Sequence, residues 1–173
     1  MNADQLKAAI RDVPDFPKPG IIFKDITPIL GDPKLFRAAI DILLARYKGV
    51  KIDKIAAIDA RGFLFGGAMA DRLGVGIVPI RKKGKLPYKT YEQSYDLEYG
   101  SATLTIHQDA FKKGDKVVLV DDLLATGGTA AASAKLIEQA GGKVVGIDFV
   151  VELAFLSGRK KLAGYDVFAP IVF

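Results

Sequence analysis

Short apolar runs alternate with helical patterns along most of the chain, and this alternation restricts the fold more than any other feature. Continuous apolar strands separated by helices are typical of a mostly parallel sheet that is covered on both faces. We therefore predict a single α/β domain over residues 1–173, with a twisted, mostly parallel sheet flanked by helices. The expected strands occupy residues 54–59, 76–80, 101–107, 116–120, 143–152 and 165–172.

The helices between these strands are predicted from their spacing and their end signals. Asp32, followed by a proline, suits the N-cap and first turn of a helix over residues 33–46. Apolar residues recur in this segment at the 3.6-residue period of one helix face. Two further helices are expected over residues 61–73, with Gly74 as the end signal, and over residues 128–139.

Composition narrows the functional classes. Half of the 173 residues are hydrophobic and 26% are charged, which is a globular profile, and charges interrupt every apolar run. We expect no membrane span and no signal peptide. The absence of cysteine excludes disulfides and thiol chemistry and fits a cytoplasmic location. A net charge of +5 suits a small anionic ligand or solubility better than nucleic acid, because no long basic stripe or nucleic-acid motif is present.

Two segments interrupt the alternation. Residues 12–31 carry four prolines and are not expected to form a regular helix. Residues 84–100 are polar, contain four tyrosines and lie between glycines. Loops of this length in compact domains are usually functional, so residues 84–100 are predicted to be a mobile lid, with a long hairpin as the alternative.

The stretch VVLVDDLLATGGT, residues 117–129, carries the strongest chemical signal. An apolar strand ends at Asp121 and Asp122, and a glycine-rich turn then leads into a helix. Ligands of open α/β sheets bind at this kind of edge, and the N-terminus of a helix favours a phosphate. Ionised carboxylates accept hydrogen bonds, so they suit the hydroxyls of a ribose or a hydrated metal ion. The stretch predicts a phosphorylated-sugar site; the alternative is a capped helix after an acidic turn.

This stretch resembles the phosphoribosyl-pyrophosphate signature of the type I phosphoribosyltransferases. Four further segments resemble the adenine-using members of that family, in the family's order. They are FPKPGIIFKDITPIL (16–30), IDARGFLFG (58–66), IRKKGKLP (80–87) and YDLEYG (95–100). The resemblance implies a purine salvage enzyme that transfers ribose 5-phosphate from phosphoribosyl pyrophosphate to adenine, giving AMP and pyrophosphate. It also implies a small N-terminal hood over residues 12–31 and a lid loop over residues 84–100.

The resemblance also assigns roles to single residues that contact the sugar donor. Asp121 and Asp122 match the carboxylates that bind the ribose hydroxyls. The 5-phosphate loop matches Ala125, Thr126, Gly127, Gly128 and Thr129, and the pyrophosphate contacts match Arg61, Arg81 and Lys85. Arg81 is implied to reach the other subunit of a homodimer. Considered without the resemblance, the basic residues around Arg81 would suit the solvent-exposed end of a hairpin.

Two departures from the family pattern bear on this site. Ala60 stands where members often have serine, which removes a hydroxyl beside Arg61. The resemblance implies a non-proline cis peptide bond near Asp59–Ala60. Lys24 stands where family members frequently have arginine. This difference should have little effect on base binding if main-chain groups form the hydrogen bonds to the base.

The adenine site is implied to lie on the extended segment IIFK. Ile22 and Lys24 are implied to present main-chain donor and acceptor groups to the purine, with Phe23 packed near its ring. The alternative is that these apolar residues only fill the core.

Proton transfer needs a group outside the signature. Ala125 occupies a position that is acidic in the 6-oxopurine enzymes, and an alanine cannot exchange a proton. Glu98, in the predicted lid, matches the family's catalytic carboxylate and is expected to exchange a proton at purine N7. His107 is a poor candidate because it alternates outward on the strand over residues 101–107, together with Thr103 and Thr105.

Catalysis is expected to need Mg²⁺ held mainly by substrate oxygens and water, without a metal cage of protein ligands. Three other classes of protein fit the sequence less well. A phosphoribosyltransferase for orotate or a 6-oxopurine lacks the segment at residues 16–30. A non-catalytic phosphoribosyl-pyrophosphate-binding regulator usually carries a further DNA-binding domain, and a receiver-type signalling domain has no use for the ATGGT loop.

Overall fold

The computed structural model describes residues 1–97 and 99–173. Contacts between residues divide the chain into two compact units, Met1–Lys48 and Gly49–Phe173, each with its own internal packing. This division does not test the prediction of a single domain over residues 1–173, because a compact unit need not fold on its own.

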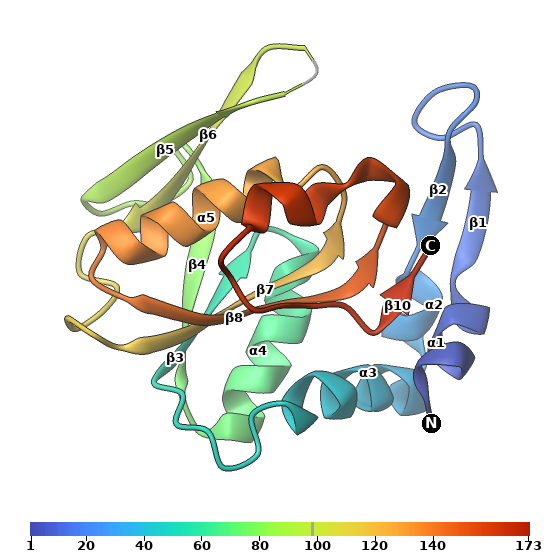
Figure 1. Ribbon diagram of the computed structural model, residues 1–173, viewed down its shortest axis with the longest axis horizontal. Coiled ribbons are helices and arrows are strands. Elements are labelled where there is room, and N and C mark those ends of the chain that lie inside the picture. Colours follow the sequence, from blue (N-terminus) through green and yellow to red (C-terminus); the bar gives the residue numbers. More distant parts are fainter. Residues whose placement is uncertain (98) are drawn as a thin grey trace. The chain divides into compact units, whose positions relative to one another are not determined.

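The first unit combines three helices with a two-stranded antiparallel ribbon (Figure 1). Asp32 caps α3 as predicted, because its carboxylate accepts hydrogen bonds from the Lys34 and Leu35 N–H groups. The extended conformation predicted for IIFK is confirmed over β2, which pairs with β1. The proline-rich segment contains one short helix, α2, that was not expected; its proline lies in the first turn, where no N–H donor is needed. The elements are α1 (Ala3–Ala9), β1 (Arg11–Pro14), β2 (Ile22–Asp25), α2 (Thr27–Gly31) and α3 (Pro33–Ala45).

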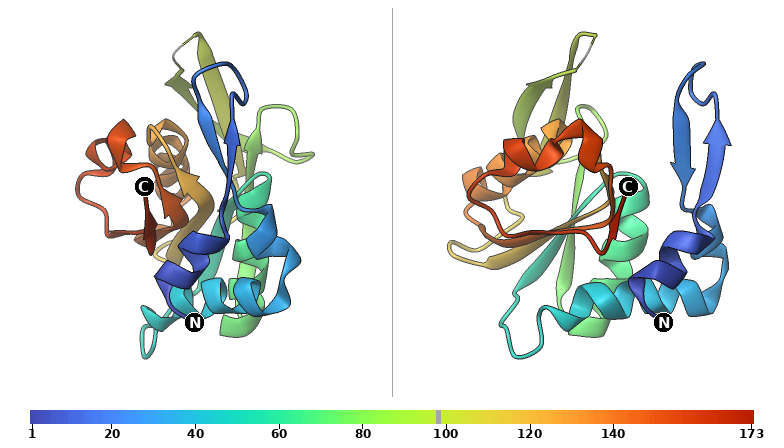
Figure 2. Two further views of the ribbon diagram at one scale, coloured as in Figure 1. Left: turned by 90° about the vertical axis from the view of Figure 1, so that its right-hand side faces the viewer. Right: turned by 45° about the vertical axis from the view of Figure 1, so that its right-hand side comes forward.

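The second unit is built on a mixed sheet in the order β10-β8-β7-β3-β4-β6-β5, with β9 beside β8. Strands β10 to β4 are parallel, and β6 and β5 add to the edge in antiparallel fashion. The helices α4 and α5 lie on opposite faces of the sheet (Figure 2). The first elements are β3 (Lys54–Ile58), α4 (Arg61–Leu73), β4 (Gly76–Lys82), β5 (Thr90–Asp96), β6 (Ser101–His107) and β7 (Lys116–Leu124). The others are α5 (Gly128–Gln139), β8 (Lys143–Glu152), η1 (Ala154–Leu156), η2 (Gly158–Leu162), β9 (Val167–Phe168) and β10 (Ile171–Val172).

The predicted fold class is confirmed by this arrangement. The central strands β3 and β7 are buried on both faces, which explains their continuous apolar runs. Gly74 ends α4 in the left-handed conformation, as its position predicted. Among the described residues, no helix combines the length and the apolar character needed to cross a membrane.

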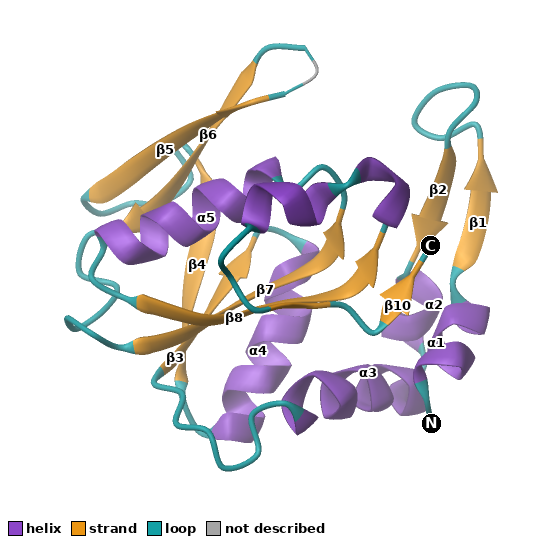
Figure 3. Cartoon of the chain, viewed as in Figure 1, coloured by secondary structure: helices purple, strands orange, loops and turns teal. Residues whose placement is uncertain are grey.

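Residues 84–100 are not the loop that was predicted, because Thr90–Asp96 forms β5 and pairs with β6 along seven residues (Figure 3). The hairpin alternative is therefore correct for this part, while its motion as a lid stays a prediction. The polar residues of β5 concealed the strand, because an edge hairpin needs no continuous apolar run. Thr105, expected to face outward, is buried, and its hydroxyl donates a hydrogen bond to the Arg81 carbonyl.

Two other strand boundaries differ from the predictions. Strand β7 continues past Val120 to Leu124, so Asp121 and Asp122 lie within the strand. Asp121 pairs with Phe149 of β8, and this pairing extends the strand beyond the apolar run. The strand expected over residues 165–172 is divided into β9 and β10.

The register of the parallel strands brings three polar residues, Asp59, Arg81 and Asp121, to one edge of the sheet. Ile58 of β3 pairs with Ile80 of β4, and Ala57 of β3 pairs with Val120 of β7. The residues that follow these pairs therefore emerge at the same edge. This carboxyl edge is where open α/β sheets bind ligands.

Candidate functional site

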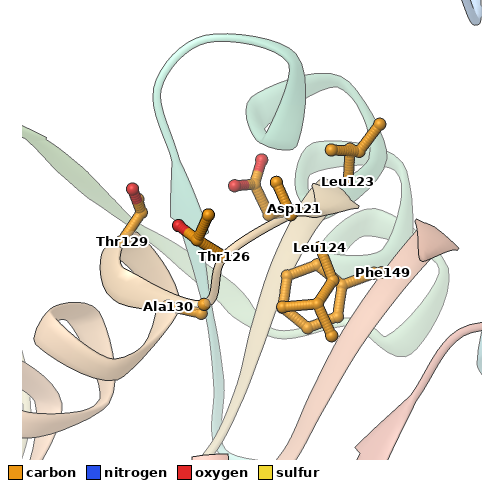
Figure 4. A pocket seen from close by; sticks show the side chains of 9 residues that line it. Asp121, Leu123, Leu124, Thr126, Thr129, Ala130 and Phe149 are labelled. Carbon is orange, nitrogen blue, oxygen red and sulfur yellow. The ribbon is translucent and has the colours of Figure 1, made fainter. Parts of the chain in front are cut away.

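The loop between β7 and α5 encloses a small cavity. It has a volume of about 90 Å³ and is lined by residues of this loop, the end of β7, the start of α5 and Phe149. The Asp121 carboxylate and the Thr129 hydroxyl lie on the same side of the loop (Figure 4). The first N–H groups of α5 have no partner within the helix, so this end carries a partial positive charge. The cavity therefore offers donors for an anion beside an acceptor carboxylate.

The acidic pair at the end of β7 is unequal in its surroundings. Asp122 is buried, and its Oδ2 accepts a hydrogen bond from Nε of Arg61, whose side chain is about half exposed (48%). The Asp121 Oδ1 accepts a hydrogen bond of 2.8 Å from the Asp122 N–H group. Burial raises the pKa of Asp121 well above its usual value, and the negative charge of Asp122 raises it further. The negative charge of Asp122 is thus paired with the Arg61 guanidinium group, whereas burial and the neighbouring charge of Asp122 both destabilise the ionised form of Asp121.

A second cavity, of about 500 Å³, lies between the end of β3, the end of β4 and the hairpin. Beside it, Arg81 donates from Nε to Asp59 Oδ2 at 2.9 Å and from Nη1 to the Lys85 carbonyl at 3.2 Å. Thr129 lines both this cavity and the loop cavity, so the two are adjacent. The residues that line the larger cavity are Ile58, Asp59, Ala60, Lys82, Lys85, Tyr95, Leu104 and Thr129.

Together these features suit one elongated anionic ligand. The loop cavity offers phosphate donors, the Asp121 and Asp122 pair offers acceptors for neighbouring hydroxyls, and the larger cavity offers lysine cations. A sugar with a phosphate at one end and a second phosphate group at the other has this sequence of charges and hydroxyls.

Comparison with known proteins agrees with this geometry. Residues 27–169 match the phosphoribosyl transferase domain family. An adenine phosphoribosyltransferase of Caldanaerobacter subterraneus subsp. tengcongensis is 58% identical over 173 residues, with 100% of each chain covered. The crystal structure of the adenine phosphoribosyltransferase from Thermoanaerobacter pseudethanolicus has a TM-score of 0.95 and 57% identity, with 99% of this chain and 100% of that chain covered. The chain belongs to the adenine phosphoribosyltransferase family.

A more distant member of the family was solved with ligands. The adenine phosphoribosyltransferase of Saccharomyces cerevisiae, in complex with D-2,5-dideoxy-2,5-imino-altritol 1,6-bisphosphate and adenine, is 44% identical to this chain. It has a TM-score of 0.92, and 98% of each chain is covered. That enzyme therefore holds a bisphosphate and a purine base on a fold shared along almost the whole chain.

Most of the residues assigned to the sugar donor come together in the second unit. The loop cavity is lined by Asp121, Ala125, Thr126, Gly127 and Thr129, and Lys85 lines the adjacent cavity. The peptide bond between Asp59 and Ala60 is cis, as predicted. The roles of these residues in binding the sugar donor stay predictions.

The residues predicted for the base and for proton transfer belong to other segments of the chain. Ile22, Phe23 and Lys24 form part of β2 in the first unit, and Lys24 Nζ donates to Asp12 Oδ1 at 2.6 Å. Glu98 lies outside the described residues, so its catalytic role stays a prediction. His107 lies on β6, and its Nε2 accepts a hydrogen bond of 3.4 Å from the Tyr88 N–H group.

One support of the phosphate loop was missed from the sequence. A Cβ added to Gly127 would lie 2.3 Å from the Gly158 carbonyl oxygen, and a Cβ added to Gly158 would lie 2.3 Å from the Ala125 carbonyl oxygen. The backbone of the loop therefore packs directly against the backbone at the start of η2, and neither Gly127 nor Gly158 leaves room for a side chain. The glycine of the signature was expected to approach a phosphate, and the structure shows that it also approaches this segment. A glycine ahead of the basic run GRKK was the only signal in the sequence.

Gly158→Ala is therefore expected to weaken binding of ribose 5-phosphate by about tenfold or more, near 1.4 kcal/mol, because the loop or η2 must shift to admit the methyl group. Titration calorimetry on the purified variant would measure this affinity. Gly67→Ala is the matched control, because a Cβ at Gly67 meets nothing within 4 Å. Equal affinity in both variants would show that this backbone contact does not shape the phosphate site.

Proposed function

We propose that this protein transfers ribose 5-phosphate from phosphoribosyl pyrophosphate to adenine in purine salvage. The observation that carries the proposal is the junction at Thr129, where the phosphate loop meets the lysine-lined cavity. Joined to membership of the adenine phosphoribosyltransferase family, this junction supports a donor with phosphate groups at both ends.

In the proposed reaction, the bond between the ribose anomeric carbon and the pyrophosphate oxygen breaks, and a bond from that carbon to adenine N9 forms. One proton leaves the base, so the products are AMP and pyrophosphate. The loop from Ala125 to Thr129 holds the 5-phosphate, and Asp121 and Asp122 accept hydrogen bonds from the ribose hydroxyls. These contacts fix the sugar while positive charge develops at its anomeric carbon.

Departure of pyrophosphate is assigned to the basic groups beside the larger cavity. Arg61 and Lys85 of one chain, together with Arg81 reaching in from the other subunit, would place positive charge where negative charge grows on the leaving group. Asp59, bonded to Arg81, would orient this guanidinium group. Closure of the hairpin over the site would keep water from hydrolysing the donor.

Mg²⁺ is proposed as the metal of the reaction. Among the described residues, no group of three or more acidic, histidine or cysteine side chains could hold a metal ion. The carboxylates of Asp121 and Asp122 are hard oxygen ligands. They therefore suit a cation that is bound largely by water and by the oxygens of phosphoribosyl pyrophosphate. When bound, Mg²⁺ would neutralise part of the pyrophosphate charge.

The base site is proposed on β2. Ile22 and Lys24 are two residues apart, so their main-chain groups point to the same side of the strand. An exposed strand edge offers N–H donors and C=O acceptors in the spacing that adenine N1 and its 6-amino group require. Phe23 would pack near the ring, and the adenine bound by the Saccharomyces cerevisiae enzyme supports this choice of base.

The decisive experiment offers adenine, hypoxanthine, guanine and orotate separately to the purified protein with Mg²⁺ and phosphoribosyl pyrophosphate. We expect kcat/KM for adenine to exceed that for hypoxanthine at least ~100-fold, about 2.7 kcal/mol. The reason is that adenine has an acceptor at N1 and a donor at its 6-amino group, whereas hypoxanthine has a donor at N1 and an acceptor at position 6. The main-chain groups that pair with adenine would therefore face a donor with a donor and an acceptor with an acceptor. A preference for hypoxanthine, guanine or orotate would overturn the choice of adenine.

A homodimer is proposed from the family role of Arg81, which is implied to reach the partner subunit. Light scattering on the purified protein tests this, and a mass of one 18.6 kDa chain would contradict it. We also propose a cytoplasmic location, because phosphoribosyl pyrophosphate and AMP are highly charged and do not cross a bilayer unaided. Fractionation of the source cells would test the location.

A further inference from the structure

Tyr95 connects the hairpin to the phosphate loop. It lies near the end of β5, and its hydroxyl is 2.9 Å from the Thr129 Oγ1 at the start of α5. Strand β5 runs beside α5 in the ribbon diagram (Figure 1). This hydrogen bond was not anticipated, because residues 34 apart in the chain make it.

The ring of Tyr95 fits against bare backbone. A Cβ added to Gly128 would lie 3.0 Å from Cδ2 of this ring, so the ring would have to shift by a few tenths of an ångström to admit it. Tyr95 also lines the 500 Å³ cavity together with Thr129. The tyrosine is therefore held by packing against the first residue of α5, and its hydroxyl is directed at the second.

The chemistry of the two hydroxyls suits a relay to an anion. A threonine hydroxyl has one proton to donate and two lone pairs to accept with. When Tyr95 donates its proton to Thr129 Oγ1, the Thr129 proton remains available for a phosphate oxygen. Hydrogen bonds in such a chain polarise one another, and a charged acceptor strengthens the last of them.

We propose that Tyr95 is a positioning residue for the 5-phosphate: it orients the Thr129 hydroxyl toward the phosphate and so joins the hairpin to donor binding. This inference rests on the proposed function, because it takes the loop cavity as the 5-phosphate site. It assigns to the hairpin a role in binding the donor, beyond covering it.

Tyr95→Phe removes the hydroxyl and keeps the ring on Gly128. Titration calorimetry should show the Kd for ribose 5-phosphate rising about 3- to 10-fold, the usual range for one hydrogen bond to this kind of site. The Kd for pyrophosphate should stay within about twofold, and steady-state kinetics should show a raised KM for phosphoribosyl pyrophosphate with kcat nearly unchanged. A general loss of structure would change all of these together.

Tyr91→Phe is the matched control. Tyr91 lies on the same strand and packs against the same core, and its hydroxyl has no hydrogen-bond partner within the described part of the chain. Its removal should leave ribose 5-phosphate binding unchanged.

A double-mutant cycle with Thr129→Val tests whether Tyr95 acts through Thr129. In the Thr129→Val background, Tyr95→Phe should cause no further loss of ribose 5-phosphate affinity. An unchanged Kd in Tyr95→Phe, or an equal loss with and without the Thr129 hydroxyl, would overturn the proposal. A wild-type protein that does not bind ribose 5-phosphate would overturn both this proposal and the proposed function. A wild-type protein that binds ribose 5-phosphate but fails to use adenine, with the Tyr95 effects present, would overturn only the function.

Discussion

Replacing Asp121 and Asp122 together with asparagine is expected to lower kcat/KM for phosphoribosyl pyrophosphate by at least ~10³-fold, about 4 kcal/mol. Each asparagine keeps an acceptor oxygen but loses the charge that strengthens a hydrogen bond from a ribose hydroxyl. Steady-state kinetics and a circular dichroism spectrum would show lost activity in a folded protein. Near-normal turnover would show that the acidic pair is only structural.

The acidic pair also has an expected effect on stability, and the structure assigns it to Asp121. Burial raises the pKa of Asp121 in the folded protein, so the folded state binds a proton more tightly than the unfolded state does. The free energy of unfolding therefore decreases as pH rises from the unfolded pKa, roughly 3.9, through the raised folded value. Asp122 differs, because removing its charge also removes its ion pair with Arg61.

The single variant Asp121→Asn should consequently have a higher Tm than the wild type at neutral pH. The difference should shrink as pH falls through the raised folded pKa and should vanish well below the unfolded pKa, roughly 3.9, where the carboxyl group is protonated in both states. Thermal melts across this range would measure it. Asp109→Asn is the control, because Asp109 is an exposed aspartate in the same unit, and it should leave the Tm at neutral pH unchanged. A lower Tm for Asp121→Asn at neutral pH would mean that the ionised carboxylate stabilises the fold.

The elements that were predicted well are those whose signals are local. The cap at Asp32, the stop at Gly74 and the apolar runs of β3 and β7 each depend on residues close in the chain. A buried parallel strand must be apolar on both faces, so its sequence alone identifies it. Helix α5 was bounded correctly because a glycine-rich turn precedes it.

The errors share a different cause, which is pairing between distant segments. Strand β5 is polar and was taken for a loop, and it exists because β6 offers a partner edge. Strand β7 extends beyond Val120 because β8 continues to pair with it. Thr105 is buried because its hydroxyl is satisfied by the Arg81 carbonyl, which an alternating pattern cannot indicate.

The candidate site divides in the same way. The phosphate loop and the acidic pair occupy nine consecutive residues, 121–129, so a motif could identify them. Tyr95 lies 34 residues before Thr129 and Gly158 lies 31 residues after Gly127; both support that loop, and neither belongs to the signature. Residues that hold a motif in place are therefore the part that only the structure reveals.

The proton that leaves adenine needs an acceptor, and Glu98 is our candidate. Forming the bond to N9 leaves the imidazole ring of adenine without its proton, so a base must accept that proton in the forward direction. The signature offers no such group, because Ala125 is inert and Asp121 and Asp122 serve the ribose. His107 already accepts a hydrogen bond from the Tyr88 N–H group. Glu98 lies outside the described residues, so this assignment rests on the resemblance of YDLEYG to the family.

Glu98→Gln is therefore expected to lower kcat by ~10²–10⁴-fold, the usual contribution of a general acid or base. The Kd for ribose 5-phosphate should change little, because the phosphate loop and the acidic pair are intact. Glu92→Gln is the matched control: Glu92 lies on the same hairpin, where it pairs with Lys83, and its replacement should leave kcat unchanged. Steady-state kinetics and calorimetry on both variants separate the outcomes. An unchanged kcat in Glu98→Gln would remove this residue from proton transfer, whereas lost affinity for ribose 5-phosphate would make it a binding residue.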